Sequence, residues 1–279
     1  MRRRPVAPQI APPGLARVEG HFGELLQGRL GPAGPVVLVT LPCPVLAARV
    51  ALVPGGMGLH QPDGRVLGLG RAARFLRALG IERASPAVLR LNMPPGGGAG
   101  ASTAALVALA RAHGAAEDRI AAACLAVEGA SDPLMLPFPG RVLWASRLGR
   151  VVGQFPALPR MEILGGFSGP ALRTDPADSR FPEIGSLVKD WAAASGDLPR
   201  LAALASRSAR MTLALRGPAG DRTEAMALKL GALGFAIAHT GSARALVFGP
   251  RGVPPGAEAA LRAAGWRQIR RFRSGGSDA

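Results

Sequence analysis

The chain has 279 residues, of which 48% are hydrophobic, and its formal net charge is +16. This size and apolar content provide a core for one large domain or two smaller ones. No apolar run approaches the roughly 20 residues of a membrane span, which excludes a membrane protein of that kind. Cys43 and Cys124 are the only cysteines, too few for a disulfide framework or a zinc site.

The positive charge would ordinarily indicate nucleic acid or a membrane surface as a partner. Lys189 and Lys229 are the only lysines, and the arginines are scattered apart from two short clusters, at 2–4 and 267–273. We therefore do not favour nucleic acid as a partner, and we expect no membrane partner. The first cluster is assigned to a mobile arm over residues 1–15. The arm lacks the apolar stretch of a secretory signal, so we expect a cytoplasmic protein; its oligomeric state stays open.

The first half of the chain alternates short apolar runs with turn residues. The runs predict strands over 36–40, 45–53 and 87–93 and helices over 69–80, 102–112 and 118–130. The helix over 102–112 is apolar on most sides and should be buried.

The second half opens with a predicted strand over 161–168. Helices are expected around 183–195, 198–215 and 220–232, then strands over 234–241 and 243–249, a helix over 256–265 and a strand over 266–273. This β-β-α-β ending is typical of a ferredoxin-like sandwich. The sequence thus predicts an α+β protein of two lobes, with a boundary near 155.

A glycine-rich stretch, PPGGGAGASTA at 94–104, lies between a predicted strand and a predicted helix. No Lys follows the glycines, so it is not a Walker A loop, and the spacing does not fit a dinucleotide fingerprint. Its backbone N–H groups and the following helix dipole would suit a phosphate. The alternative is an ordinary strand-to-helix turn whose glycines only permit close packing, and spacing alone leaves both open.

This stretch resembles the second motif of the GHMP kinases, P-x-x-x-G-L-G-S-S-A. GHFGELLQG at 20–28 is similar to the opening signature of one branch, the bacterial L-threonine kinases of cobalamin synthesis. FAIAHTGSARALVF at 235–248 is similar to that branch's third motif. CLAVEGASDPLMLP at 124–137 resembles the segment that carries an E-P-x-D element, here one residue longer.

The resemblance implies a two-lobed fold, with an ATP-binding N-terminal lobe over 16–155 that holds the Gly-rich phosphate loop and a ferredoxin-like C-terminal lobe over 156–279. It also implies ATP and Mg²⁺ as cofactors and L-threonine, or a similar hydroxy compound, as the small-molecule substrate. Phosphate contacts fall to the loop, that is, to Pro94, Gly96, Gly97, Gly98, Ala99, Gly100, Ala101, Ser102 and Thr103. Ala101 stands where the family usually has the first of two serines.

The same resemblance assigns the remaining site residues. Asp132, with Ser102, would be catalytic, and Ser102 and Glu128 would hold the metal. Substrate contacts would come from Glu24, Gln27, His239, Thr240, Gly241 and Ser242. Arg173 is a further candidate for binding a carboxylate or a phosphate.

Structural roles are the alternatives for these residues. Glu128 could simply end a helix, and Asp132 could form the turn before Pro133. Glu24 and Gln27 could be a solvent-facing pair in a hairpin. His239 could have a structural role in a tight turn. Three other functions also stay open: a GHMP kinase for another alcohol such as homoserine, a non-catalytic regulator that binds a nucleotide or metabolite, and a basic nucleic-acid-binding protein.

Overall fold

The computed structural model describes residues 14–56, 58–172 and 175–276. The predicted arm therefore lies outside the described residues, except for Gly14 and Leu15. The first half contains β1 (Leu15–Arg29), β2 (Val36–Leu52), β3 (Leu59–His60), α1 (Leu69–Ala78), β4 (Ala87–Leu91), α2 (Ala101–Ala112), α3 (Glu117–Glu128), β5 (Val142–Ala145) and β6 (Arg150–Gln154). The second contains β7 (Met161–Phe167), α4 (Gly185–Ala193), α5 (Leu198–Arg216), α6 (Thr223–Lys229), β8 (Gly234–Ile237), β9 (Ala243–Phe248), α7 (Ala257–Ala263) and β10 (Arg267–Ser274).

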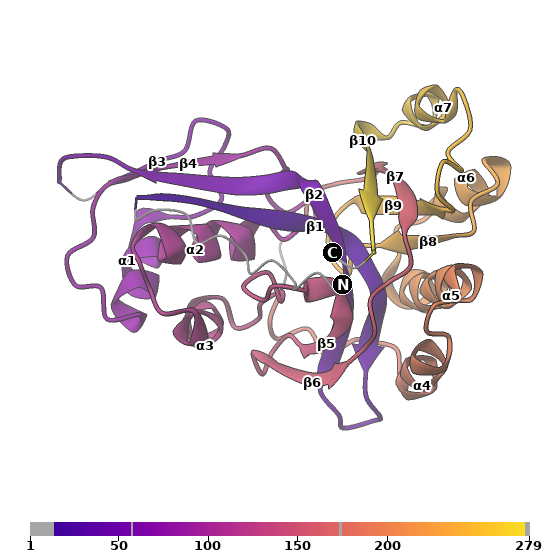
Figure 1. Cartoon of the computed structure of the whole chain (residues 1–279), viewed down its shortest axis with the longest axis horizontal. Helices are drawn as coiled ribbons and strands as arrows, with labels where there is room; N and C mark the ends of the chain where they lie inside the picture. The colour runs from indigo at the N-terminus through magenta and orange to yellow at the C-terminus, as the bar shows by residue number, and fades with distance from the viewer. Residues whose placement is uncertain (1–13, 57, 173–174, 277–279) are drawn as a thin grey trace, which may run out of the picture.

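One sheet runs through the described chain in the order β10-β7-β9-β8-β1-β2-β4-β3 (Figure 1). Its first four strands are antiparallel neighbours. With the helices between them they form the predicted ferredoxin-like arrangement. β1 joins this part to the rest where Glu24 pairs with Ile237. The α+β fold is thus confirmed, whereas the lobe boundary near residue 155 stays a prediction.

The prediction of two strands over 36–40 and 45–53 is wrong, because β2 continues through both. Pro42 and Pro44 do not end it, since its pairing with β1 shifts register at this place. Glu19 pairs with Ala47 but Gly20 with Cys43, so three extra residues of β2 are accommodated in a bulge. Bulges are among the few places where a sheet tolerates proline. The bulge lies beside the part of β1 that carries His21 and Glu24.

Helix α2 packs beneath β1 and β2, and ten of its twelve residues are buried, as its apolar sequence predicts. It belongs to the larger of two hydrophobic clusters, and the smaller one lies among α6, α7, β8 and β9. Because α2 is fixed by this packing on several sides, its N-terminus presents the glycine loop from a rigid base. This loop, the register shift in β1 and β2, and the β8–β9 turn lie together in the structure.

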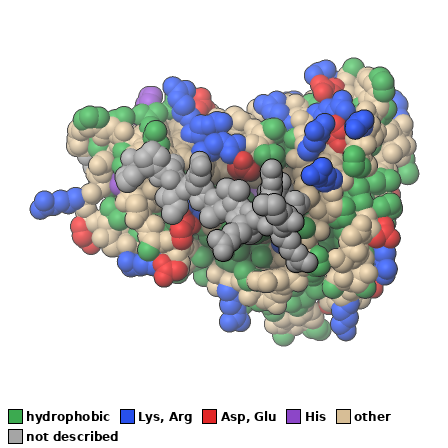
Figure 2. Space-filling model, in the orientation of Figure 1, with side chains coloured by type: hydrophobic (Ala, Val, Ile, Leu, Met, Phe, Trp, Pro, Cys, Tyr) green, Lys and Arg blue, Asp and Glu red, His purple; other side chains and the backbone are tan. Residues whose placement is uncertain are grey.

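The predicted strands do not include β1, which is long, or β3, β5 and β6, which are short strands of two to five residues. β5 and β6 form a hairpin that pairs with β2 at Val37 and Leu38. Among the described residues no helix has the length and apolarity needed to cross a membrane. Figure 2 shows Lys and Arg side chains in several separate groups on the face that it presents.

Candidate active site

A cleft of about 330 Å³ lies where β1, the glycine loop and the β8–β9 turn meet. The segment after α3 (130–132), residues 36–38 of β2, Arg147, Leu172, Pro176 and Phe181 also line it, as do Arg65 and Arg71. Of the residues predicted for the site, these line it: Glu24, Gln27, Gly96, Gly98, Gly100, Ala101, Ser102, Thr103, Glu128, Asp132, His239 and Thr240. Pro94, Gly97, Ala99, Gly241 and Ser242 are not among the lining residues.

The glycine loop needs its glycines for backbone conformation and for space. Gly96, Gly98 and Gly100 have φ angles of 73°, 77° and 74°, which side chains strongly disfavour. A Cβ on Gly98 would lie 2.2 Å from Thr240 O, and one on Gly100 would lie 2.6 Å from His21 Cδ2. Gly100 is also the N-cap of α2, and no side chain caps this helix end. The first N–H groups of α2 are therefore available to an anion in the cleft.

The other residues of the loop and of the β8–β9 turn hold the two segments together. Gly97 O accepts hydrogen bonds from Ser242 N and Ala243 N, at 2.9 and 2.8 Å. Gly241 has a φ angle of 95°, and a Cβ there would lie 2.5 Å from Gly97 C. Glycine at 241 thus permits two backbones to touch, which explains why two motifs far apart in sequence form one wall.

Ser102 of α2 and Glu128 of α3 are in direct contact in the wall of the cleft. Ser102 Oγ donates a hydrogen bond to Glu128 Oε2 at 2.7 Å, and Arg71 of α1 lies 3.0 Å from Glu128 Oε1. Ser102 therefore does not cap α2 but directs its hydroxyl to a carboxylate. A hydroxyl and a carboxylate side by side offer the hard oxygen atoms that Mg²⁺ prefers. The donor set fits the predicted metal.

His21 lies between two carboxylates at the base of the cleft. Its Nδ1 lies 3.5 Å from Glu24 Oε1 and its Nε2 lies 3.4 Å from Asp132 Oδ2. His21 and Glu24 are each only 3% exposed, whereas Asp132 is 25% exposed and so faces the open cleft. Asp132 N also donates to Thr103 Oγ1 at 3.3 Å, which ties it to the first turn of α2.

These contacts set the protonation states of the three groups. Burial lowers the pKa of His21, but Glu24 and Asp132 together raise it to about 9. Burial raises the pKa of Glu24 to about 7, against the opposing effect of His21. Burial also acts to raise the pKa of Asp132, yet His21 and Thr103 hold it below its usual value. At neutral pH Asp132 is therefore an ionised carboxylate held beside an imidazolium.

His21, Glu24 and Asp132 could also be considered as metal ligands, because one ligand atom from each lies within 4.8 Å of the others. The proton on His21 opposes this use, since a metal needs the neutral imidazole as its ligand. Mg²⁺ also prefers oxygen to nitrogen. Ser102 and Glu128 consequently stay the predicted metal ligands, and the chemistry of the His21 group suits proton transfer better than metal binding.

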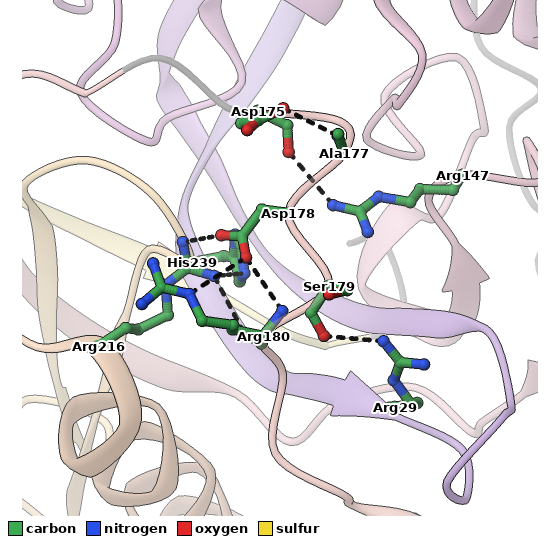
Figure 3. A network of polar contacts seen from close by, with 9 residues as sticks. All are labelled: Arg29, Arg147, Asp175, Ala177, Asp178, Ser179, Arg180, Arg216 and His239. Carbon is green, nitrogen blue, oxygen red and sulfur yellow. Dashed lines mark hydrogen bonds and ion pairs between the residues drawn. The ribbon is translucent and has the colours of Figure 1, made fainter.

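Gln27 and His239 are fixed by neighbours in the cleft wall. Gln27 Nε2 donates to Ile237 O at 3.0 Å, and its buried Oε1 has no hydrogen-bond partner among the described residues. His239 stacks on Phe181 with ring centroids 4.1 Å apart and accepts a hydrogen bond from Arg216 at Nε2, 2.7 Å away (Figure 3). Burial, followed by the charge of Arg216, lowers the pKa of His239 to about 3. The imidazole ring is thus neutral and forms part of the cleft wall.

Several residues that line the cleft were not identified from the sequence, among them His21, Arg71, Arg147 and Phe181. His21 stands in the first motif, and its position three residues before Glu24 was a usable signal. The other three belong to segments without a motif and come to the cleft only through the fold. Arg173, which was a candidate for anion binding, lies outside the described residues.

Comparison of the sequence with protein-family models and with curated proteins gave no match. Comparison with solved structures gave several. The mevalonate kinase of L. major in complex with R-mevalonate superposes with a TM-score of 0.66 at 15% identity, covering 100% of both chains. A homoserine kinase from Cytophaga hutchinsonii gives 0.63 at 18% identity, with 95% of each chain covered. A 4-(cytidine 5'-diphospho)-2C-methyl-D-erythritol kinase gives 0.53 at 26%, with 94% of this chain and 99% of that one covered. The chain therefore has the fold of the GHMP kinases.

Proposed function

We propose that the protein is an ATP-dependent kinase that phosphorylates the hydroxyl of a small molecule, and that its acceptor is L-threonine. The observation that carries the kinase is the meeting, in one cleft, of a glycine loop on a helix N-terminus, the Ser102–Glu128 pair and the ionised Asp132. The GHMP kinase fold supports it. The product would be O-phospho-L-threonine, the form used for the aminopropanol linker of cobalamin.

The glycine loop would hold the polyphosphate of ATP. The loop and the first turn of α2 line the cleft, and the positive end of the helix dipole favours an anion there. Ser102 and Glu128 would hold Mg²⁺, which neutralises charge on the phosphate oxygens when it is bound. Thr103 would remain beside Asp132, to whose N–H its hydroxyl is bonded.

Asp132 would accept the proton of the acceptor hydroxyl. The acceptor oxygen forms a bond to the γ-phosphorus, the bond from that phosphorus to the β,γ-bridging oxygen breaks, and ADP leaves. The hydroxyl proton passes to an Asp132 oxygen. An ionised carboxylate with an opening to the cleft suits this step. His21 would stabilise the charged form of Asp132 before transfer.

The choice of L-threonine depends on the resemblance of the first and third motifs. Glu24 would contact the ammonium group, because its buried Oε2 has no hydrogen-bond partner among the described residues. Gln27, His239 and Thr240 line the same cleft, and Gly241 and Ser242 would support them from behind. Cys43 and Cys124 are buried free thiols, which suits a reducing compartment such as the cytoplasm.

An assay of ADP release tests both parts of the proposal, the kinase activity and the choice of L-threonine as acceptor. The protein would be supplied with Mg-ATP and, in separate reactions, L-threonine, L-serine, L-homoserine or no acceptor. Turnover that depends on L-threonine supports the full proposal, and turnover with L-homoserine instead retains the kinase and rejects the acceptor. ATP binding without turnover on any acceptor would contradict the kinase and favour a regulator.

A further inference from the structure

We propose that Arg147 binds a carboxylate of the acceptor, so that the substrates of this cleft are small hydroxy acids. This inference rests on the proposed kinase function and names the chemical class of its acceptor. It concerns a residue outside the motifs, at the end of the β5 strand. Three features of Arg147 support this role: its position, its lack of an acidic partner among the described residues, and the charge around it.

Arg147 is held close to the proposed catalytic carboxylate by the backbone. The residue before it, Ser146, accepts a hydrogen bond at its carbonyl from Ser131 N, at 2.9 Å. Ser131 precedes Asp132, and its own carbonyl accepts a hydrogen bond from Trp144 Nε1 at 2.7 Å. Both Arg147 and Asp132 line the cleft. A small acceptor could therefore place its hydroxyl at Asp132 and its other end at Arg147.

The guanidinium of Arg147 has no carboxylate within ion-pair distance among the described residues. It donates to the carbonyl oxygen of Asp175 at 3.3 Å, and its buried Nε has no hydrogen-bond partner there (Figure 3). The nearby carboxylate of Asp178 is occupied by Arg216 and by Arg180. A guanidinium has five donors that suit the two oxygens of a carboxylate, and most of those of Arg147 remain unused.

The surroundings of Arg147 strengthen the attraction for an anion. Figure 3 shows Arg29, Arg180 and Arg216 near Arg147 and the segment 175–180, together with Asp175 and Asp178. Phe181 lies with its ring 5.1 Å from the Arg147 guanidinium and displaces water from one side. Burial lowers the pKa of Arg147, which indicates a charge that water stabilises incompletely. A bound carboxylate would supply the missing partner.

The experiment compares Arg147→Met with a matched variant, Arg150→Met, whose arginine is exposed on β6 and does not line the cleft. Acceptors are L-threonine and its uncharged-carboxyl analogue L-threoninamide. We expect Arg147→Met to raise KM for L-threonine at least about 30-fold, with KM for ATP unchanged and L-threoninamide unaffected. Arg147→Lys should recover part of the loss, because lysine keeps the charge without the planar fork. Arg150→Met should match the wild type.

An equal effect of Arg147→Met on both acceptors, or no effect on L-threonine, would overturn the inference. Calorimetry separates this from failure of the kinase proposal. If no acceptor is phosphorylated, binding of L-threonine, L-homoserine and R-mevalonate to the protein saturated with ADP is measured instead. Binding that is lost in Arg147→Met but kept in Arg150→Met supports the carboxylate site without turnover. Binding that is equal in both, or absent in the wild type, contradicts it.

Discussion

The imidazole Nε2 of His21 lies 3.4 Å from the carboxylate Oδ2 of Asp132, although the two residues are far apart in the sequence. The first is buried in β1 and the second follows α3 at the cleft. Nδ1 of the same ring faces Glu24. One imidazolium between two acids thus keeps the more exposed acid ionised, and this relationship determines how the proposed reaction depends on pH.

Replacing His21 by Gln should change the pH profile of kcat/KM at both ends. His21 is the main cause that lowers the pKa of Asp132, so the acidic limb should move to higher pH. The alkaline limb expected near pH 9, where His21 loses its proton, should disappear. The measurement is kcat/KM between pH 3 and 10, because the acidic limb of the wild type lies below the usual pKa of an aspartate. Unchanged limbs would contradict the pairing.

The same pair makes a prediction for stability that does not require activity. The pKa of His21 is about 9 in the folded protein and near 6.5 in the unfolded chain. Its contribution is therefore fully present below pH 6.5 and is lost as the pH rises through 9. Glu24 titrates near pH 7 in the wild type, so the wild-type curve from pH 7.5 to 9.5 reports mainly on His21. Urea unfolding of the wild type should show its free energy of unfolding falling across that window, and a flat curve would contradict this.

Alanine at Gly98 should cost more than alanine at Gly31, although both glycines have a φ angle of 77°. A Cβ at Gly31 meets nothing within 4 Å, whereas one at Gly98 meets Thr240 O and the Ala238 side chain. Gly31→Ala should lower the free energy of unfolding by about 1–2 kcal/mol. Gly98→Ala should lower it by a further 1–3 kcal/mol or so and raise KM for ATP, as denaturant titration and kinetics would show. Equal effects would refute a steric role for Gly98.

Glu128→Gln should raise the Mg²⁺ concentration needed for half-maximal activity by at least about 10-fold. The carboxylate that meets Ser102 Oγ would become an amide with one fewer strong oxygen ligand. Glu117→Gln is the control, because Glu117 lies in the same helix but pairs with Arg111 away from the cleft. The measurement is a titration of activity with Mg²⁺ at fixed ATP. Matching curves for the two variants would exclude Glu128 as a metal ligand.

Much of the fold was predictable because its signals are local. The helices at α1, α2 and α5 have strong periodicity or long apolar runs, and the β8-β9-α7-β10 ending identified the ferredoxin-like part. The continuous β2 was missed because the register shift opposite Gly20 accommodates Pro42 and Pro44, and this depends on the partner strand. β5 and β6 were missed because they are too short to show a period.

The residues of the candidate site also fall into those that the sequence predicts and those that only the fold brings together. The sequence motifs brought Ser102, Glu128 and Asp132 forward as candidates, and the structure places all three in one cleft. Arg147 and Phe181 have no motif, and only tertiary packing brings them to that cleft. The role of His21 depends on two carboxylates, of which Asp132 is distant in sequence. Spacing along the chain carries no information about such a contact.

The most direct test of the proposed reaction compares wild type with Asp132→Asn in the ADP-release assay with Mg-ATP and L-threonine. Asparagine keeps the shape of the side chain but cannot accept the hydroxyl proton. We expect turnover by the wild type and a loss of kcat of about 10²- to 10⁴-fold in the variant, with little change in KM for ATP. Turnover that survives in Asp132→Asn would contradict the role of Asp132 as the base, and absence of turnover in the wild type with every acceptor would contradict the kinase itself.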